Sequence, residues 1–296
     1  MPVDVHTHPH RRSVKDRDGH YGNYNLAAEW LPDGSFKPGF VEEYLADFAE
    51  MDRVVVLAVA APYWIGAQND LIAAFAKACG DKVIGFASVD PNSPTAIPDL
   101  ERAVLEYGLR GVKLAPIYQN FEPDSPAIYP LYSKIRELGV PIIWHQGTSM
   151  AARMGPLEAA HPVRLDRVLR DFPEITMIFS HLCYPWAQDA IVMARKHPQL
   201  YVDISAMATR PWYVYNALVA AKEYEALGKI IFASDYPWYT PQVTREALFA
   251  LADMATGTNL PQLTPAELHA IYEADAVKML GLPPRPAPSP VIAQSS

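Results

Sequence analysis

Eight short apolar segments, each followed by a helical pattern, constrain the fold of this chain more than any other feature of its sequence. Most of them are continuously apolar rather than alternating, as is typical of parallel strands that are covered on both faces. This order of strands and helices predicts an α/β protein whose strands close into a (β/α)8 barrel. The segments are Val3–Val5, Val54–Val59, Val83–Ala87, Gly111–Leu114, Val140–Trp144, Ile175–Phe179, Tyr201–Ile204 and Ile230–Ala233.

Capping signals mark the helices between these strands. Ser125 followed by Pro126 predicts the start of a helix, and Gly139 predicts its end. The capping box from Thr264 to Glu267 predicts an extra C-terminal helix that runs to about Leu280. Further helices are expected at Phe40–Met51, Pro162–Asp171, Pro185–Lys196, Pro211–Leu227 and Pro241–Met254.

The length of the chain fits one barrel. It has 296 residues, and a barrel of this kind needs about 250. We therefore expect a single domain over residues 1–282, followed by a disordered tail over 283–296 that is rich in Pro, Ala and Ser. An open doubly wound sheet is the alternative, but no glycine-rich nucleotide-binding motif follows the first strand.

Composition narrows the expected partners to a small-molecule substrate. A net charge of −8 argues against binding to nucleic acid or to an anionic membrane surface. No apolar run approaches the roughly 20 residues that span a bilayer. The first residues lack the pattern of a signal peptide, and the two cysteines, Cys79 and Cys183, fit a reducing compartment. We expect a cytoplasmic protein, and a homodimer remains open.

Polar residues stand where several of the predicted strands end. His6 and His8 follow the first strand, His145 the fifth, His181 the sixth and Asp235 the eighth. Barrel enzymes carry their working residues at the carboxyl ends of the strands. His6 and His8 are two residues apart, so both side chains point to one face of a strand. Imidazole and carboxylate groups together suit zinc, manganese or iron.

Each of these residues alone also has a purely structural explanation. A histidine beside an apolar run, such as His145 or His181, is more often a hydrogen-bonded core residue than a ligand. Asp235 precedes Tyr236-Pro237 and could simply form a turn. The coincidence of polar residues at four strand ends favours a metal site over these separate explanations.

Aromatic and arginine side chains near the strand ends suggest the substrate only in outline. Tyr118, Trp186 and Trp238 predict a pocket for a planar or apolar substrate, although aromatic residues also commonly pack barrel loops. The arginines that could bind a substrate carboxylate are Arg11, Arg153 and Arg210.

Five short motifs together resemble the amidohydrolase superfamily. Within it the chain is most similar to the group that contains aminocarboxymuconate-semialdehyde decarboxylase and γ-resorcylate decarboxylase. The resemblance extends from the first to the eighth strand and implies a TIM barrel of the metal-dependent hydrolase type. The motifs are Asp4-Val5-His6-Thr7-His8, Gly111-Val112-Lys113-Leu114, Trp144-His145-Gln146-Gly147, Ser180-His181-Leu182 and Ala233-Ser234-Asp235-Tyr236-Pro237.

The resemblance implies a division of roles among these residues. The positions that match His6, His8, His145 and Asp235 hold one divalent metal ion, with zinc expected first and manganese or iron as alternatives. The position that matches His181 is an acid–base residue. The ligand set itself, apart from the resemblance, lets Asp235 both bind the metal and hold a water molecule, so we expect Asp235 to take part in catalysis as well. Lysines that match Lys113 are carboxylated in binuclear relatives, but here we expect a barrel lysine that pairs with a carboxylate.

Three functions remain open from the sequence. The first is a metal-dependent hydrolase of an ester, lactone or amide, in which the metal activates a water molecule. The alternative is a metal-dependent non-oxidative decarboxylase, or a hydratase, of a planar aromatic or unsaturated carboxylic acid. The third is a barrel with a vestigial site that catalyses nothing.

Overall fold

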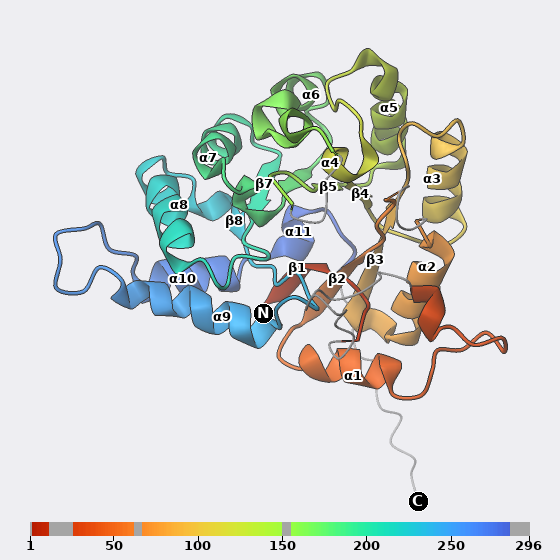
Figure 1. The fold of residues 1–296 in the computed structure, drawn as a ribbon, viewed down its shortest axis with the longest axis horizontal. Helices are drawn as coiled ribbons and strands as arrows, with labels where there is room; N and C mark the ends of the chain where they lie inside the picture. Colours follow the sequence, from red (N-terminus) through yellow and green to blue (C-terminus); the bar gives the residue numbers. More distant parts are fainter. Residues whose placement is uncertain (1, 12–25, 62–66, 150–154, 285–296) are drawn as a thin grey trace, which may run out of the picture.

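The chain folds into an eight-stranded parallel barrel, which confirms the predicted fold class. The computed structural model describes residues 2–11, 26–61, 67–149 and 155–284. The strands are hydrogen-bonded in the order of the sequence, and helices surround them (Figure 1). They are β1 (Val3–Thr7), β2 (Arg53–Leu57), β3 (Val83–Ser88), β4 (Val112–Leu114), β5 (Ile142–Trp144), β6 (Met177–Phe179), β7 (Leu200–Asp203) and β8 (Ile230–Ile231).

The helices that follow the strands cover the outside of the barrel. Most begin where a proline or a capping side chain predicts it, and Gly139 ends α5 with a left-handed φ of 64°. The helices are α1 (Phe40–Asp47), α2 (Asn69–Ala78), α3 (Ala96–Leu105), α4 (Pro116–Gln119), α5 (Tyr129–Leu138), α6 (Asp166–Asp171), α7 (Ala187–Lys196), α8 (Pro211–Glu223), α9 (Pro241–Ala250), α10 (Pro265–Tyr272) and α11 (Ala276–Met279). None of the helices in the described ranges is long and apolar enough to cross a membrane.

The C-terminal helix is present but divided. The predicted helix to Leu280 stops at Tyr272, and α11 starts again after Asp275, whose side chain accepts a hydrogen bond from the Lys278 amide at 3.1 Å. The break lets Leu280 and Leu282 pack with the inward-facing strand residues. α11 therefore closes one end of the barrel interior. The tail from residue 285 onward lies outside the described residues.

The barrel closes where β1 meets β8. β8 is short, and the seam is completed by the segment that follows it: the Asp235 amide donates to the His6 carbonyl at 2.9 Å. The His8 amide donates to the Tyr236 carbonyl at 2.8 Å. The buried Asp4 carboxylate accepts the Ser234 amide at 3.1 Å and so adds a side-chain bond to the seam. The two strands that carry His6, His8 and Asp235 are thereby held side by side.

Candidate metal centre

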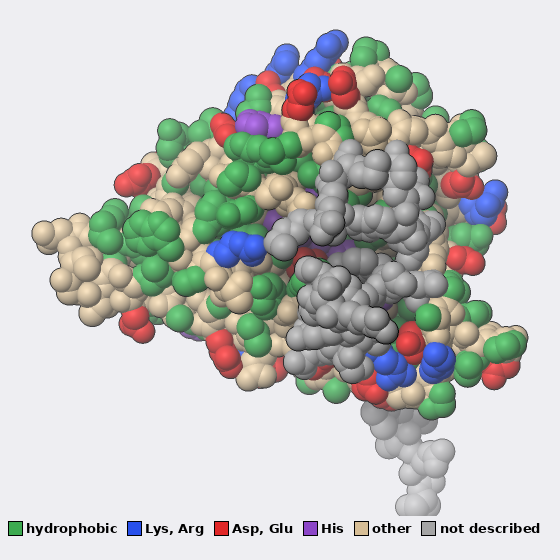
Figure 2. Space-filling model, in the orientation of Figure 1, with side chains coloured by type: hydrophobic (Ala, Val, Ile, Leu, Met, Phe, Trp, Pro, Cys, Tyr) green, Lys and Arg blue, Asp and Glu red, His purple; other side chains and the backbone are tan. Residues whose placement is uncertain are grey.

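The polar residues predicted from the strand ends lie on one rim of the barrel. His6 belongs to β1 and His8 follows it, while His145, His181 and Asp235 come after β5, β6 and β8. All five side chains are buried. Figure 2 shows histidine and acidic side chains near the centre of the face viewed there. Parallel strands bring their carboxyl ends to the same rim, which is why residues far apart in the sequence meet here.

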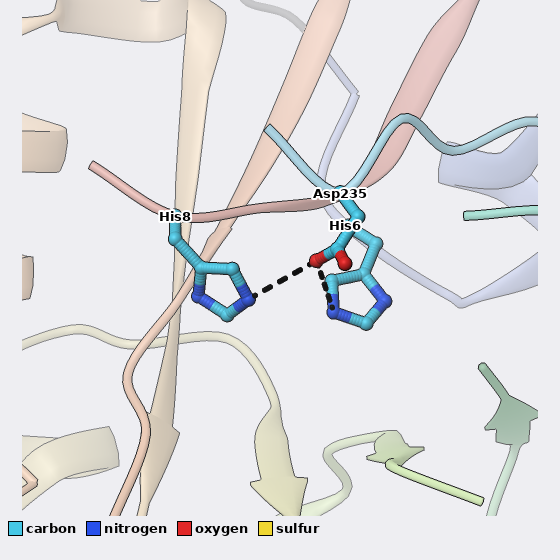
Figure 3. Close-up of side chains that lie close together, drawn as sticks. All are labelled: His6, His8 and Asp235. Carbon is cyan, nitrogen blue, oxygen red and sulfur yellow. Dashed lines mark ion pairs between the residues drawn. The ribbon is translucent and has the colours of Figure 1, made fainter. Parts of the chain in front are cut away.

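Three of the four predicted ligands converge on one point. The Nε2 atoms of His6 and His8 each lie 3.5 Å from Oδ1 of Asp235 (Figure 3). The opposite ring nitrogens are held by the protein. Nδ1 of His6 lies 3.1 Å from Oδ2 of Asp203, and Nδ1 of His8 lies 3.4 Å from the Leu57 carbonyl oxygen. Carboxylate and carbonyl oxygens accept hydrogen bonds, so each Nε2 is left with its lone pair facing Asp235. This donor set fits a divalent metal ion.

His145 does not join that group of three. Its Nδ1 lies 3.1 Å from Nε2 of His181, and its Nε2 is buried without a hydrogen-bond partner. The His181 ring in turn lies 4.8 Å from the His6 ring, measured between centroids. The imidazoles of His6, His181 and His145 therefore form a row, which we call the histidine row. It starts at His6, in the converging group, and leads away from it to His145. That His145 is the fourth ligand stays a prediction.

Burial favours the neutral imidazoles of His6, His145 and His181, whereas neighbouring polar groups keep the Asp235 carboxylate charged. Burial, together with the nearby Lys113 charge, lowers the pKa of His6 to about 3. Burial also lowers the pKa values of His145 and His181. For Asp235 burial alone would raise the pKa, but its interactions with the imidazoles of His8, His6 and His181 hold it well below its usual range. Neutral imidazoles and an ionised carboxylate are the forms that bind metal ions.

Lys113 lies beside this cluster and differs from the expectation. Its ammonium nitrogen is 3.3 Å from Nε2 of His6 and 3.3 Å from Oγ of Ser180. No described carboxylate lies within ion-pair distance of it, so the expected pairing with a carboxylate is wrong. Burial lowers its pKa to about 8, while Asp203 and Asp235 act in the opposite direction. The structure thus places a cationic side chain against a candidate ligand.

The loop after β6 holds His181 in an unusual backbone conformation. His181, Leu182 and Cys183 have φ angles of 61°, 47° and 50°. Non-glycine residues rarely adopt this region, and where they do, the surrounding structure fixes them there. Gly147, after β5, lies against this loop, and the Thr148 amide donates to the Tyr184 carbonyl at 2.7 Å. These contacts set the spacing of His145 and His181.

The arginines predicted to bind substrate lie in different settings. Arg11 is engaged by Glu29 at 3.1 Å and Glu43 at 2.6 Å, so its donors are already taken by the protein. Arg210 donates to the Ala206 carbonyl at 2.9 Å and lies 5.1 Å from the centre of the Tyr184 ring. Arg153 lies outside the described residues.

The three aromatic candidates also differ. The Tyr118 ring is 4.5 Å from the His145 ring, and its hydroxyl donates to Oγ of Ser149 at 2.6 Å. The Trp186 ring lies 4.7 Å from His161, on the loop before α7. Trp238 is partly exposed just after the Asp235 turn, and its amide donates to the Asp235 carbonyl at 2.9 Å. Of the three, Tyr118 contacts the histidine row through its ring.

Two residues of the site, Asp203 and Ser205, escape the sequence reasoning. Asp203 ends β7, and its carboxylate contacts Nδ1 of His6. Oγ of Ser205 lies 3.2 Å from Nδ1 of His6 and 2.7 Å from Nδ1 of His181. The sequence feature that could have indicated them is that the polar residues Asp203 and Ser205 stand at the end of the seventh strand, on the same rim as the histidines. It was hidden because Asp203 lies within an apolar run.

A parallel (β/α)8 barrel with buried histidines and an aspartate at its carboxyl rim defines the class of metal-dependent barrel enzymes. The amidohydrolase family profile matches residues 3–282, so this chain belongs to the amidohydrolase family and is an enzyme of that superfamily. This agrees with the resemblance carried by the five motifs.

Individual relatives are distant. The chain is 23% identical over 174 residues to 2-amino-3-carboxymuconate-6-semialdehyde decarboxylase of Dictyostelium discoideum, a match that covers 49% of this chain and 48% of that protein. The match thus spans about half the length of that relative. An uncharacterised TIM-barrel protein from Bordetella bronchiseptica has a TM-score of 0.69 at 23% identity, covering 95% of this chain and 98% of the other. A dihydroxybenzoic acid decarboxylase from a Polaromonas species, solved with manganese and an inhibitor, has a TM-score of 0.63 at 16% identity, covering 95% and 96%. The two structural likenesses show the fold.

Proposed function

We propose that this protein is a metal-dependent, non-oxidative decarboxylase of a planar aromatic or unsaturated carboxylic acid. The observation that carries the proposal is an arginine in the loop after β7, at the rim that carries the histidines, whose charge no described carboxylate neutralises. A decarboxylase must hold a substrate carboxylate, whereas the hydrolysis of a neutral ester or amide needs no cationic partner. A cation in a loop at this rim therefore favours the first activity over the second.

Arg210 is that cation. It lies in the loop between β7 and α8, and its described hydrogen bond runs to the Ala206 carbonyl. No described carboxylate lies within ion-pair distance of it, so part of its guanidinium donors remain for a ligand. Ala206 follows Ser205, whose hydroxyl contacts His181. A guanidinium binds a carboxylate through two parallel hydrogen bonds, which fix the orientation of an acid.

The metal ion would be held by His6, His8 and Asp235, with His145 as the predicted fourth ligand. When bound, such an ion acts as a Lewis acid that polarises an oxygen of the substrate or lowers the pKa of a water molecule. The manganese in the Polaromonas decarboxylase is consistent with a divalent ion in a related barrel. Zinc, manganese and iron all remain candidates here.

His181 would move the proton. In decarboxylation the bond between the carboxyl carbon and the neighbouring carbon breaks, and its electron pair stays on that neighbouring carbon as CO2 leaves. That carbon then takes a proton, which His181 delivers after taking it from water. Tyr118, whose ring contacts His145, would pack against the planar part of the substrate.

The competing function is the hydrolysis of an ester, lactone or amide. A neutral His181 beside a metal centre could remove a proton from water equally well. The decarboxylase named among the relatives of this chain supports the first function, and Arg210 does so independently. The hydrolase prediction therefore takes second place.

An assay on purified protein loaded with zinc or manganese separates the two. We expect CO2 release from at least one member of a panel of hydroxybenzoic and unsaturated dicarboxylic acids, and no comparable hydrolysis of 4-nitrophenyl esters or aryl lactones. Arg210→Gln should raise KM at least tenfold without loss of metal, whereas Arg195→Gln, on the outer helix α7, should change nothing. Ester or lactone hydrolysis without CO2 release would instead establish the hydrolase.

Two histidine variants test the division of roles. His181→Ala should lower kcat by about 10²–10⁴-fold while the metal content stays close to wild type. His145→Ala should lose metal. A His181→Ala protein that purifies without metal, or that keeps full activity, would contradict the role given to His181.

A further inference from the structure

The end of β7 places one carboxylate behind two of the site's histidines. We propose that Asp203 is a positioning residue that fixes the proton on Nδ1 of His6 and, through Ser205, on Nδ1 of His181. Nε2 of His6 then keeps its lone pair for the metal centre, and Nε2 of His181 can accept a hydrogen bond from His145. The inference rests on the proposed function only in taking His6 as a metal ligand, and it deepens that function by naming what orients the ligand.

The first step concerns His6. Oδ2 of Asp203 lies 3.1 Å from Nδ1 of His6, and both side chains are buried. Oδ1 of Asp203 accepts hydrogen bonds from the amides of His181 and Ser205 at 2.9 Å and 3.0 Å, and from the Ser205 hydroxyl. Donors surround both oxygens, so the carboxylate acts only as an acceptor. Nδ1 of His6 must therefore carry the hydrogen.

The opposite nitrogen of His6 agrees with this assignment. Its Nε2 faces the ammonium of Lys113 at 3.3 Å, and an ammonium group can only donate. Nε2 also faces Asp235, with which His6 and His8 form the converging cluster. The lone pair of His6 therefore points to where a metal ion would lie.

The second step passes through Ser205. Its hydroxyl has one hydrogen, which it donates to Asp203, so its oxygen accepts from Nδ1 of His181 at 2.7 Å. The Ser205 carbonyl oxygen, 3.3 Å from the same nitrogen, is also an acceptor. His181 therefore carries its hydrogen on Nδ1 and presents a lone pair on Nε2.

The third step reaches His145. Nε2 of His181 lies 3.1 Å from Nδ1 of His145, and since the former is an acceptor the latter must donate. Nε2 of His145, which is buried and has no partner, is then left with a lone pair. One carboxylate thus determines which nitrogen carries the hydrogen in a row of three imidazoles.

Asp203 could instead be a metal ligand itself, because its carboxylate lies within 4.8 Å of ligand atoms of His6 and His181. The contacts argue against that reading. The nitrogen that His6 turns toward Asp203 is Nδ1, at hydrogen-bond distance, while its Nε2 is turned toward Asp235. A buried carboxylate behind a ligating imidazole is the usual arrangement for orienting the ring.

Asp203→Asn tests the proposal because the side chain keeps its shape but gains a donor. The amides of His181 and Ser205 and the Ser205 hydroxyl all donate to the position of Oδ1, so the oxygen of the asparagine should stay there. Its NH2 group should then face Nδ1 of His6. His6 must in that case carry its hydrogen on Nε2 instead. We expect ¹⁵N NMR of the metal-free protein to show Nδ1–H for His6 in wild type and Nε2–H in Asp203→Asn. The affinity for Zn²⁺ should fall about 10–100-fold.

Two further variants sharpen the result. Ser205→Ala keeps the bond from Asp203 to His6, so the His6 tautomer and the affinity for Zn²⁺ should stay close to wild type. Asp166→Asn is the matched control, because Asp166 also accepts from an imidazole, that of His197 at 2.8 Å, but on the outer helices. It should change neither readout.

Two results would overturn the proposal. Nε2–H on His6 in the wild-type protein does so without any variant, even if Asp203→Asn fails to fold. Loss of Zn²⁺ binding in Asp203→Asn with an unchanged His6 tautomer would make Asp203 a direct ligand. Because the spectra need neither metal nor substrate, a failure to release CO2 would count against the proposed function and leave this inference standing.

Discussion

At the scale of single residues, Gly147 is a position beside the site that leaves no room for a side chain. It has a φ of 98°, and a Cβ built there would lie 2.6 Å from the Tyr184 carbonyl oxygen and 2.7 Å from the Cys183 carbonyl carbon. Both are backbone atoms of the loop that carries His181. An alanine would therefore be strained by its own backbone and would also push the two loops apart.

We predict that Gly147→Ala lowers the free energy of unfolding by about 1–3 kcal/mol and disturbs the contact between His145 and His181. Gly139→Ala is the control, because Gly139 has a φ of 64° but nothing within 4 Å of its Cβ position. Urea unfolding of both variants measures the difference. If Gly139→Ala costs as much as Gly147→Ala, the close approach of the two loops contributes nothing.

At the scale of secondary-structure elements, α6 and α7 are joined by one carboxylate. Asp166, the first residue of α6, accepts hydrogen bonds from Lys196 and His197 at the end of α7 and from Arg170 one turn along its own helix. Partial burial raises the pKa of Asp166, but these partners outweigh it and hold the pKa at about 2. The group therefore favours the folded state when it is charged.

Asp166→Ala should lower the free energy of unfolding by about 1–2 kcal/mol near neutral pH, a modest value because the group is partly exposed. The folded pKa lies below the ordinary value of 3.8, so this contribution is present above about pH 4 and is lost as the pH falls toward 2. Urea unfolding at about pH 7 and pH 3 should show the difference from wild type shrinking. Asp81→Ala, at an exposed turn, is the control and should show no such trend.

The sequence predicts elements well where local chemistry decides them. All eight strands coincide with apolar runs because a parallel strand that is covered on both faces must be apolar. Helices that begin with a proline or a capping threonine, such as α9 and α10, are equally visible. α2 and α3 are not, because neither has a side-chain cap at its start. The break between α10 and α11 depends on packing in the barrel interior, which no local signal records.

The candidate site is predictable only in part, for a related reason. His6, His8 and Asp235 follow strands, so their convergence follows from the fold. The contact between His145 and His181 depends on a loop with left-handed φ angles at His181, Leu182 and Cys183, where the sequence has no glycine to announce it. The bonds of Asp203 depend on Ser205 in the same way, because the next residue, Ala206, has a φ of 60°. Tertiary structure, not local sequence, imposes these conformations.

At the scale of the whole molecule, the two ends of the barrel have different tasks. The carboxyl rim carries the candidate metal centre, while α11 packs Leu280 against the inward-facing strand residues. Leu280 is 3% exposed. Truncating a buried leucine leaves a cavity that lowers stability. The carboxyl rim, which carries the candidate metal centre, lies at the other end of the barrel and need not move.

Leu280→Ala should therefore lower the free energy of unfolding by about 2–5 kcal/mol and leave the affinity for Zn²⁺ close to wild type. Leu260→Ala, at a site that is 45% exposed, should cost little. Denaturant unfolding and chelator competition measure the two quantities. A large loss of Zn²⁺ affinity in Leu280→Ala would show that the two ends of the barrel are coupled.

The seam between β1 and β8 also dictates when the centre can come into being. His6 and His8 are synthesised long before Asp235, which comes after all eight strands in the chain. The ligands made first must wait for Asp235, so the centre is absent from every chain that has not yet reached this residue. An ion bound across the seam favours only the finished ring. Metal occupancy would then report that the chain has been made as far as Asp235 and that the barrel has closed between β1 and β8.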